Sequence, residues 1–398
     1  MTFISFSLVT LAGLLAFPVV ILLVEVVAAI TLPQQDCTVA PCKDSGRRVA
    51  VVVPAHNEGI NLLPTLADIK AQLRAGDRLL VVADNCADDT AAVAAEADAE
   101  VVVRNDPVRI GKGYALDWGL RHLGMEPPDI VVIVDADCRL ADSAIDRLAA
   151  ACAVAHRPVQ ALDLLTAPDE SPINFRVDEF AWRLKNWVRP LGLRALGLPC
   201  QLMGTGMAFP WDVICSTDLA SGLIVEDLKL GLDLALAGNS PIFCPSARVT
   251  SHFPFSAEGV QSQRLRWEQG HIGMILSTAP RLILPAIVQA NVDLLALAFD
   301  VMVPPLSLLG MLVMGMWVVA GVAILLGISS VAMFVSSASL VGFTGAVFIS
   351  WLKYGRDILP PGSILSIFSY VFGKLPLYRK ILSRKSGPQW IRTDRSKI

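Results

Sequence analysis

The 398-residue chain lacks features that would assign it to several common functional classes. Its net charge is only −3 and both signs are spread along its length, so nothing indicates a nucleic-acid partner. Neither G-x-G-x-x-G nor G-x-x-x-x-G-K-S/T follows any predicted strand. The dinucleotide-binding and P-loop solutions to phosphate binding are therefore absent, and a diphosphate ligand would need a metal ion in place of the glycine-rich loop.

Paired metal-binding cysteines and histidines are also scarce. Cys37 and Cys42 are close in sequence, but no second Cys or His pair follows at zinc spacing, which disfavours a structural zinc site. The other six of the eight cysteines are scattered over a region that we expect to lie in the reducing cytoplasm. We interpret them as free thiols.

Charged side chains are missing from residues 2–24, a run longer than the roughly 20 apolar residues that cross a bilayer. With 54% hydrophobic residues and a mean hydropathy of +0.56, the chain is too apolar for two soluble domains. The start has neither the basic side chains nor the small-residue cleavage site of a signal peptide. We predict a transmembrane helix within residues 1–32 and a linker over residues 33–47.

Two further apolar runs, 306–326 and 331–352, are long enough to span and are joined by a tight connection, which predicts a helical hairpin. Residues 282–299 are expected to form one interfacial helix, and residues 364–372 are expected to lie on the membrane surface. Cations that follow the first span and occupy the tail place both the catalytic region and the carboxyl terminus in the cytoplasm. The expectation is an integral membrane protein, of the bacterial inner membrane, whose residues 281–398 form a membrane region with two of its three spans.

Residues 48–280 show the alternation of an α/β domain. Apolar strands are each followed by a polar turn and a helical segment, which predicts a mostly parallel sheet with a ligand crevice at the strands' carboxyl ends. The predicted strands are Val49 to Val53, Arg78 to Ala83, Glu100 to Val103 and Ile130 to Val134.

The fourth strand ends in Asp135-Ala136-Asp137. Residues two apart on an extended backbone project to the same side, so both carboxylates can face one point. Two hard oxygen ligands suit Mg²⁺ or Mn²⁺ bound to a diphosphate. The alternative is a polar strand end without a ligand.

Other candidate segments have a structural and a functional interpretation. Gly111-Lys112-Gly113 precedes a helix predicted over 114–123 and is either a solvated turn or a nucleotide contact. Residues 171–199 combine aromatic and basic side chains, typical of an interfacial helix but also of an ordinary packed one. Gly204-Thr205-Gly206 permits close backbone approach to a ligand.

Two helical segments follow. Glu226 and Asp227 open a predicted helix, where acids complement the helix dipole or perform chemistry. Gln263, Arg266, Trp267 and Gly270 share one face at i, i+3, i+4 and i+7 spacing. A guanidinium suits phosphate and an indole suits the apolar face of a sugar.

Asp84, the Asp135-Ala136-Asp137 triplet, the Glu226-Asp227 pair and Gln263-Arg-Leu-Arg-Trp267, in this order, resemble the membrane-bound family 2 glycosyltransferases. That family includes cellulose, chitin and hyaluronan synthases, chitin-oligosaccharide synthase and ceramide glucosyltransferase. The resemblance covers roughly residues 48–280 and the membrane arrangement around them. It implies a GT-A fold and inverting transfer from a nucleotide sugar, expected to be a UDP-sugar.

The resemblance implies a role for each matching residue. Asp227 is the expected general base, and Asp137, with Asp135, is the expected ligand of Mg²⁺ or Mn²⁺. Residues expected to bind the donor are Pro54, Glu58, Asp84, Lys112, Asp135, Gln263, Arg264 and Arg266. Residues expected to bind the acceptor are Gly204, Thr205, Gly206, Glu226 and Trp267. Ser251-His252-Phe253-Pro254 departs from relatives that have an acidic residue before this proline, which puts the acceptor contacts there in doubt.

The sequence leaves the product open. Three spans provide little material for a polysaccharide tunnel within one chain, which favours a single transfer to a lipid-linked or other membrane-associated acceptor at the cytoplasmic face. A polysaccharide synthase that is completed by oligomerisation or by a channel partner is the alternative. A catalytically silent sugar-nucleotide sensor or transport component is disfavoured because base, metal and phosphate residues occur together.

Overall fold

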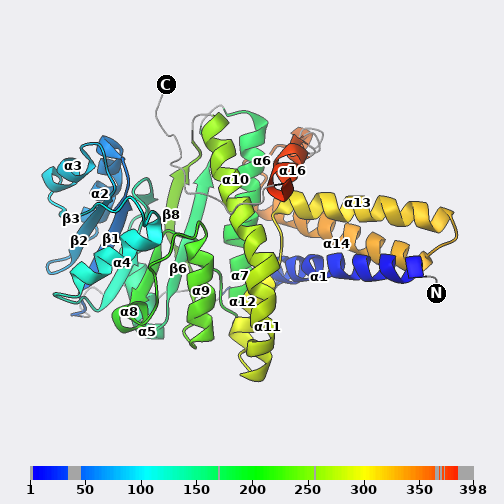
Figure 1. Cartoon of the computed structure of the whole chain (residues 1–398), viewed down its shortest axis with the longest axis horizontal. Coiled ribbons are helices and arrows are strands. Elements are labelled where there is room, and N and C mark those ends of the chain that lie inside the picture. Colours follow the sequence, from blue (N-terminus) through cyan, green and yellow to red (C-terminus); the bar gives the residue numbers. More distant parts are fainter. Residues whose placement is uncertain are drawn as a thin grey trace.

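A computed structural model describes residues 3–34, 46–168, 171–254, 257–363, 367, 370, 371 and 373–383. A sheet covered by helices forms one end of the molecule, and three long helices project from the other (Figure 1). Most of the predicted linker, with Cys37 and Cys42, lies outside the described residues, as does much of the segment 364–372.

The sheet has eight strands in the order β3-β2-β1-β4-β7-β6-β8-β5. The pairs β1–β2, β1–β4, β2–β3 and β6–β8 are parallel, whereas β4–β7, β6–β7 and β5–β8 are antiparallel. The strands are β1 (Val49–Ala55), β2 (Arg78–Asp84), β3 (Glu100–Arg104), β4 (Ile130–Ile133), β5 (Arg139–Leu140), β6 (Val159–Thr166), β7 (Met207–Pro210) and β8 (Ile242–His252). The predicted mostly parallel α/β sheet is confirmed, and the four predicted strands differ from these bounds by two residues at most.

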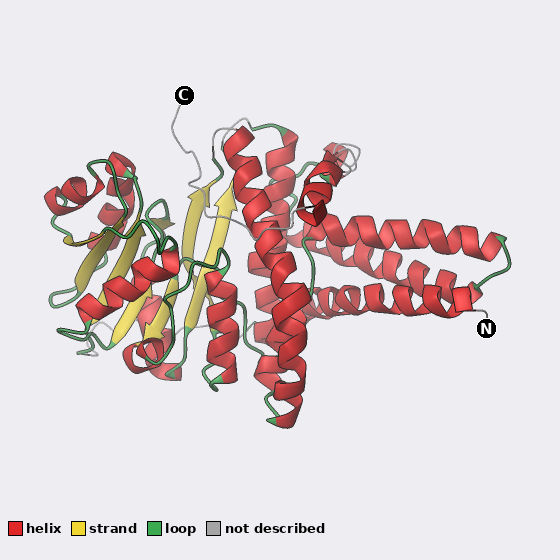
Figure 2. Cartoon of the chain, in the orientation of Figure 1, coloured by secondary structure: helices red, strands yellow, loops and turns green. Residues whose placement is uncertain are grey.

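The apolar runs form strands because helices bury both faces of the sheet. In β1, Val49, Val51 and Val53 pack into one apolar cluster, and Ala50 and Val52 pack into the other. An uninterrupted apolar run suits this environment better than an alternating pattern. The covering helices, visible in Figure 2, are α2 (Leu63–Lys70), α3 (Thr90–Glu96) and α5 (Ala144–Ala155) on one side and α4 (Lys112–Leu123), α8 (Trp211–Cys215) and α9 (Glu226–Leu236) on the other.

Four helices in the described part of the chain are long and apolar enough to cross a membrane. Three of them, α1 (Phe3–Thr31), α13 (Leu306–Leu325) and α14 (Ser330–Tyr354), lie side by side as a bundle, as predicted from their sequences (Figure 1). The fourth, Gly259–Val288, was not predicted as a candidate span. In Figure 1 it runs across the bundle, so a membrane crossed by the bundle would have this helix along its surface.

The crossing helix comprises α10 (Ala257–Gly273), the π-turn η3 (Met274–Thr278) and α11 (Ala279–Val288), and α12 (Val292–Val301) follows. The single helix predicted over 282–299 is therefore wrong. The chain breaks because Ala290 has a positive φ of 51°, and the Asn291 side chain then accepts a hydrogen bond from the backbone N–H of Leu294 to cap α12.

The segment predicted as interfacial, 171–199, lies between the sheet and the bundle as α6 (Ile173–Arg183), the π-turn η2 (Leu184–Val188) and α7 (Arg189–Ala195). Two of its cations pair with carboxylates of the protein. Buried Arg189 donates to Glu25 of α1 at 2.6 Å and also pairs with Asp300, and Arg183 pairs with Glu179 and Asp357. Arg189 thus links this segment to α1 and α12, and Arg183 links it to the chain just after α14.

Candidate active site

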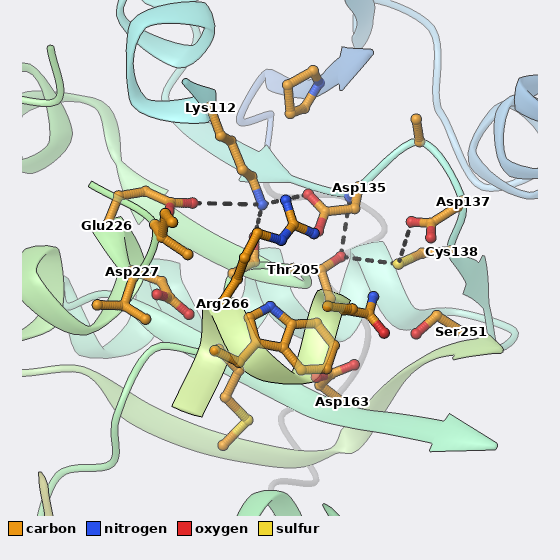
Figure 3. A pocket seen from close by; sticks show the side chains of 18 of the residues that line it. Lys112, Asp135, Asp137, Cys138, Asp163, Thr205, Glu226, Asp227, Ser251 and Arg266 are labelled. Carbon is orange, nitrogen blue, oxygen red and sulfur yellow. Dashed lines mark hydrogen bonds and ion pairs between the residues drawn. The ribbon is translucent and has the colours of Figure 1, made fainter. Parts of the chain in front are cut away.

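A cavity of about 310 Å³ opens at the carboxyl ends of β1 and β4, the edge where the sequence placed its crevice (Figure 3). We call it the polar cavity. It brings together predicted site residues from seven separate parts of the chain. The predicted site residues that line it are Pro54, Glu58, Asp84, Lys112, Asp135, Asp137, Gly204, Thr205, Glu226, Asp227, Gln263, Arg266 and Trp267.

Lys112 lies at the centre of the charged groups in Figure 3. At the start of α4, its ammonium pairs with Asp135, donates to the carbonyl oxygen of Gly204 at 2.6 Å and lies 4.0 Å from Glu226. Burial by itself would lower the pKa of Lys112, but Asp135 and Glu226 raise it above its ordinary value. A cation is thereby held among carboxylates, in position to contact an anionic ligand.

Asp227 and Glu226 begin α9 and reach the cavity from the side opposite β4 (Figure 3). Burial raises the pKa of Asp227, and burial together with Asp227 raises the pKa of Glu226 to about 8. Gly204, which faces this carboxylate, has a φ of +90°, a backbone conformation that favours glycine. The site thus holds a half-buried carboxylate with a raised proton affinity.

Asp84 lies at the end of β2, further along the same edge. Its Oδ1 accepts a hydrogen bond of 2.6 Å from Arg104, which also lies 5.4 Å from the ring of Tyr114. Nearby, the backbone N–H of Glu58 donates to the hydroxyl of Thr90 at 2.9 Å. Pro54, Glu58 and Asp84, three of the residues expected to bind the donor, therefore lie together at the carboxyl ends of β1 and β2.

Helix α10 supplies Gln263, Arg266 and Trp267, which share one face as their spacing predicts. The Trp267 ring lies 5.0 Å from the ring of Trp182 on α6. Gly270, on the same face, lets α10 approach Val225, because a Cβ at Gly270 would lie 2.7 Å from the Val225 side chain. The packing of α10 on this loop aims its polar face into the cavity.

Two predicted site residues are not brought to the polar cavity. Arg264 pairs with Asp178 and lies 5.5 Å from the ring of Tyr370, on another side of α10 from Arg266. Gly206 is packed in the sheet, where a Cβ would lie 2.8 Å from the side chains of Ala161 and Val249. Neither Arg264, expected to bind the donor, nor Gly206, expected to bind the acceptor, is among the residues that line the polar cavity.

The lining residues that the sequence reasoning did not assign to the site include Asp163, Lys185, Asn186 and His271. Asp163 accepts a 3.0 Å hydrogen bond from Asn186, and burial together with Asp135 raises its pKa to about 7. The sequence feature that points to Asp163 is a single acidic residue inside the apolar strand β6. Lys185 belongs to the segment 171–199, whose pattern is typical of an interfacial helix.

His271 and Ser251 occupy other walls of the cavity. Burial lowers the pKa of His271 to about 3, and its Nε2 lies 2.9 Å from the carbonyl oxygen of Val301, which makes it a neutral donor. Ser251 belongs to the segment Ser251-His252-Phe253-Pro254, which departs from the family pattern. In the same segment, the Nδ1 atom of His252 lies 2.9 Å from the hydroxyl oxygen of Thr166.

The donor set fits a divalent cation only together with a bound diphosphate. Asp135 and Asp137 line one cavity, but within the described ranges no group of three or more His, Cys, Asp or Glu side chains could hold a metal. Mg²⁺ in nucleotide sites is commonly bound by one or two carboxylates, with phosphate oxygens and water completing its coordination. The two aspartates match that pattern.

Comparison with known proteins gives one family. Residues 46–270, more than half of the chain, match the model described as "Glycosyltransferase like family 2". Uncharacterised glycosyltransferases of Mycobacterium tuberculosis and Mycobacterium bovis are 44% identical over 93 residues, which are 23% of this chain. The match spans 38% of the length of those relatives.

Among solved structures, the mannosyltransferase of Pyrobaculum calidifontis in complex with GDP-Man and Mn²⁺ is similar over 95% of this chain and 100% of its own. The identity is 18% and the TM-score is 0.54. At this identity the likeness shows a common fold, the GT-A type expected from the sequence. It also extends over most of the chain, beyond the sheet domain.

Proposed function

The chain belongs to the glycosyltransferase-like family 2, and we propose that it is an inverting, metal-dependent glycosyltransferase whose acceptor is a membrane lipid or lipid-linked molecule. One observation carries the proposal. A half-buried carboxylate on α9, that of Asp227, lines the same cavity as the Lys112 ammonium and the two carboxylates that follow β4. That arrangement separates a proton acceptor from a diphosphate-binding side, as a displacement at a sugar carbon requires.

The diphosphate side comprises Lys112, Arg266 and the pair Asp135 and Asp137. The two aspartates would hold Mg²⁺ or Mn²⁺, which when bound neutralises charge on the leaving diphosphate. Lys112 and Arg266 add fixed positive charge in a partly buried site, where electrostatic stabilisation is stronger than in water. Asp84, Glu58 and Pro54 lie where the nucleoside would extend.

The acceptor side comprises Asp227 and the two tryptophans. The acceptor oxygen attacks the anomeric carbon, the bond from that carbon to the diphosphate oxygen breaks, and the diphosphate leaves with the electron pair. Asp227 receives the hydroxyl proton as the new bond forms. Its raised pKa makes it a better proton acceptor than an exposed aspartate. Trp267, stacked beside Trp182, provides an apolar surface for the sugar.

The membrane assignment rests on the bundle of α1, α13 and α14. If the bundle crosses the bilayer, α10 and α11 lie along its surface and the polar cavity opens close to the interface. We propose the cytoplasmic face, because cations follow the first span and occupy the chain after the hairpin.

The test uses the purified full-length protein in lipid nanodiscs. It is incubated with radiolabelled UDP- and GDP-sugars, Mn²⁺ or Mg²⁺, and a total lipid extract of bacterial membranes. We expect metal-dependent label in the lipid phase from one donor, and an inverted anomeric configuration by NMR. Absence of transfer and of donor hydrolysis with every donor would contradict the proposal and favour a silent nucleotide-sugar sensor.

A further inference from the structure

A second cavity, of about 480 Å³, lies between the sheet domain and the bundle. We call it the apolar cavity. Its walls come from α6, α10, α13 and α14, and most of the residues that line it are apolar, such as Phe180, Met311, Met314, Phe343 and Val347. The volume falls within the range of about 300 to 1,000 Å³ that is usual for small-molecule sites.

The two cavities adjoin. Trp182, Lys185, Gln263, Trp267 and His271 line both of them. The stacked pair of Trp182 and Trp267 therefore stands at the boundary, with the charged groups on one side and the apolar walls on the other. A molecule in the apolar cavity would therefore be separated from the polar cavity only by these shared side chains.

Most charged groups on the walls of the apolar cavity have ion-pair partners within the protein, and Lys185, at the boundary with the polar cavity, lies 5.4 Å from the centre of the Trp182 ring. Arg264 pairs with Asp178, and Lys374 lies 3.2 Å from Glu268 and 3.6 Å from Asp178. Arg189, as described above, pairs with Glu25 and Asp300. Because these charges are compensated within the protein, they do not form a polar lining for the hydroxyl groups of a sugar chain.

The apolar lining therefore favours a lipid over a polysaccharide as the ligand of this cavity. A sugar polymer would lose hydrogen bonds to water against the apolar walls, at a cost for every unpaired hydroxyl. A hydrocarbon chain gains by the same burial. We infer that the apolar cavity holds the hydrocarbon chain of the acceptor, a hydroxyl-bearing membrane lipid whose hydroxyl passes the two tryptophans to reach Asp227. The inference rests on the proposed glycosyltransferase function and names its acceptor class.

The helices of the hairpin allow a matched test. Met314 on α13 and Thr344 on α14 line the apolar cavity, whereas Leu312 and Val341, on the same two helices, are exposed and do not line it. Met314→Trp and Thr344→Trp fill the cavity. Leu312→Trp and Val341→Trp add the same bulk on an outward face and serve as controls for folding and insertion.

Occupancy is measured with a photoreactive probe, a diacylglycerol that carries a diazirine in one acyl chain, in nanodiscs that contain the full-length protein. Peptide mapping should place cross-links on residues that line the apolar cavity. Those cross-links should decrease in the two filled variants and remain in the two controls. Cross-links confined to the outward faces of α13 and α14 would overturn the inference.

Transfer is measured in parallel with the bacterial lipid extract and the radiolabelled donor. The filled variants should transfer about tenfold less sugar to lipid, the effect of displacing roughly two methylene groups, while nucleotide-sugar binding stays unchanged. Lipid transfer at the parent rate in both filled variants would overturn the inference and leave the proposed function intact.

Label in a water-soluble polymer that disappears on filling would overturn the inference in favour of a polymer path. Loss of transfer in the parent protein itself would contradict the proposed function, and the cross-link map would still decide what occupies the cavity.

Discussion

Replacement of Asp227 by asparagine tests the proposed base directly. Asparagine has nearly the same shape but cannot take up the acceptor proton. Positioned general bases contribute about 10² to 10⁴-fold to a rate, which corresponds to about 2.7 to 5.4 kcal/mol of barrier. Because burial raises the pKa of Asp227 and so strengthens it as a base, we expect the loss in transfer rate to lie in the upper part of that range.

The variant should fold. Since burial raises the pKa of Asp227, the folded protein disfavours the charged form, and a neutral amide removes that cost. The opposing loss is the interaction of a carboxylate with the first turn of α9, typically about 0.3 to 1 kcal/mol. These two effects on the free energy of unfolding have opposite signs, so the midpoint of thermal unfolding should be nearly unchanged.

Glu226→Gln is the matched control. Glu226 is adjacent, lines the same cavity and has a pKa of about 8, so it is mostly protonated at neutral pH. Its amide variant mimics the neutral form, and we expect a change in transfer of less than about tenfold. Donor binding, measured by calorimetry with Mn²⁺, should be retained in both variants.

The pH profile provides a second check. The base acts when it is deprotonated, so the parent kcat/KM should rise with pH through a pKa above the ordinary aspartate value of about 3.9. This acidic limb should be lost in Asp227→Asn. Near-normal transfer by Asp227→Asn, loss of its donor binding, or a larger defect in Glu226→Gln would refute the assignment of Asp227 as the base.

Three further predictions concern the metal, the acceptor and the packing of the bundle. Asp137→Asn should abolish the stimulation of transfer by Mn²⁺ or Mg²⁺ in a folded protein, and a metal titration that matches the parent would contradict this. Trp267→Ala should weaken acceptor use and spare donor binding by calorimetry, with the exposed Trp118→Ala as control; equal effects of both on transfer would argue against a sugar platform. Gly192→Ala should destabilise the protein by about 1 to 3 kcal/mol, because the added Cβ would overlap the backbone of Glu25 in α1. Gly13→Ala is the control, because a Cβ at Gly13 meets no atom within 4 Å. Thermal unfolding in detergent should show a lower midpoint for Gly192→Ala than for Gly13→Ala.

The sequence was most informative where a local pattern has one physical solution. Apolar runs such as Val49 to Val53 end close to the observed strand bounds because burial on both faces leaves little room for polar residues. The long uncharged runs became α1, α13 and α14 because only a helix satisfies its own backbone within so apolar a stretch. The parallel order then placed Asp84 and Asp135 at one edge.

Helical periodicity predicted which residues of α10 line the polar cavity. Gln263, Arg266 and Trp267 share a face and line it, whereas Arg264, two positions before Arg266, lies on another side of the helix. Its partner, Asp178, comes from α6 and could be identified only in the folded chain.

What the sequence determined by itself was therefore the strands, the long apolar helices and the motifs that stand at strand and helix ends, because these depend on neighbours within a few residues. The tertiary structure decided which side chains meet across long separations. Asp163 and Lys185 enter the polar cavity, Arg189 joins Glu25 and Asp300, and the crossing helix runs across the end of the bundle nearest the sheet. Each of these depends on contacts between distant segments, whose burial and charge pairing no local pattern encodes.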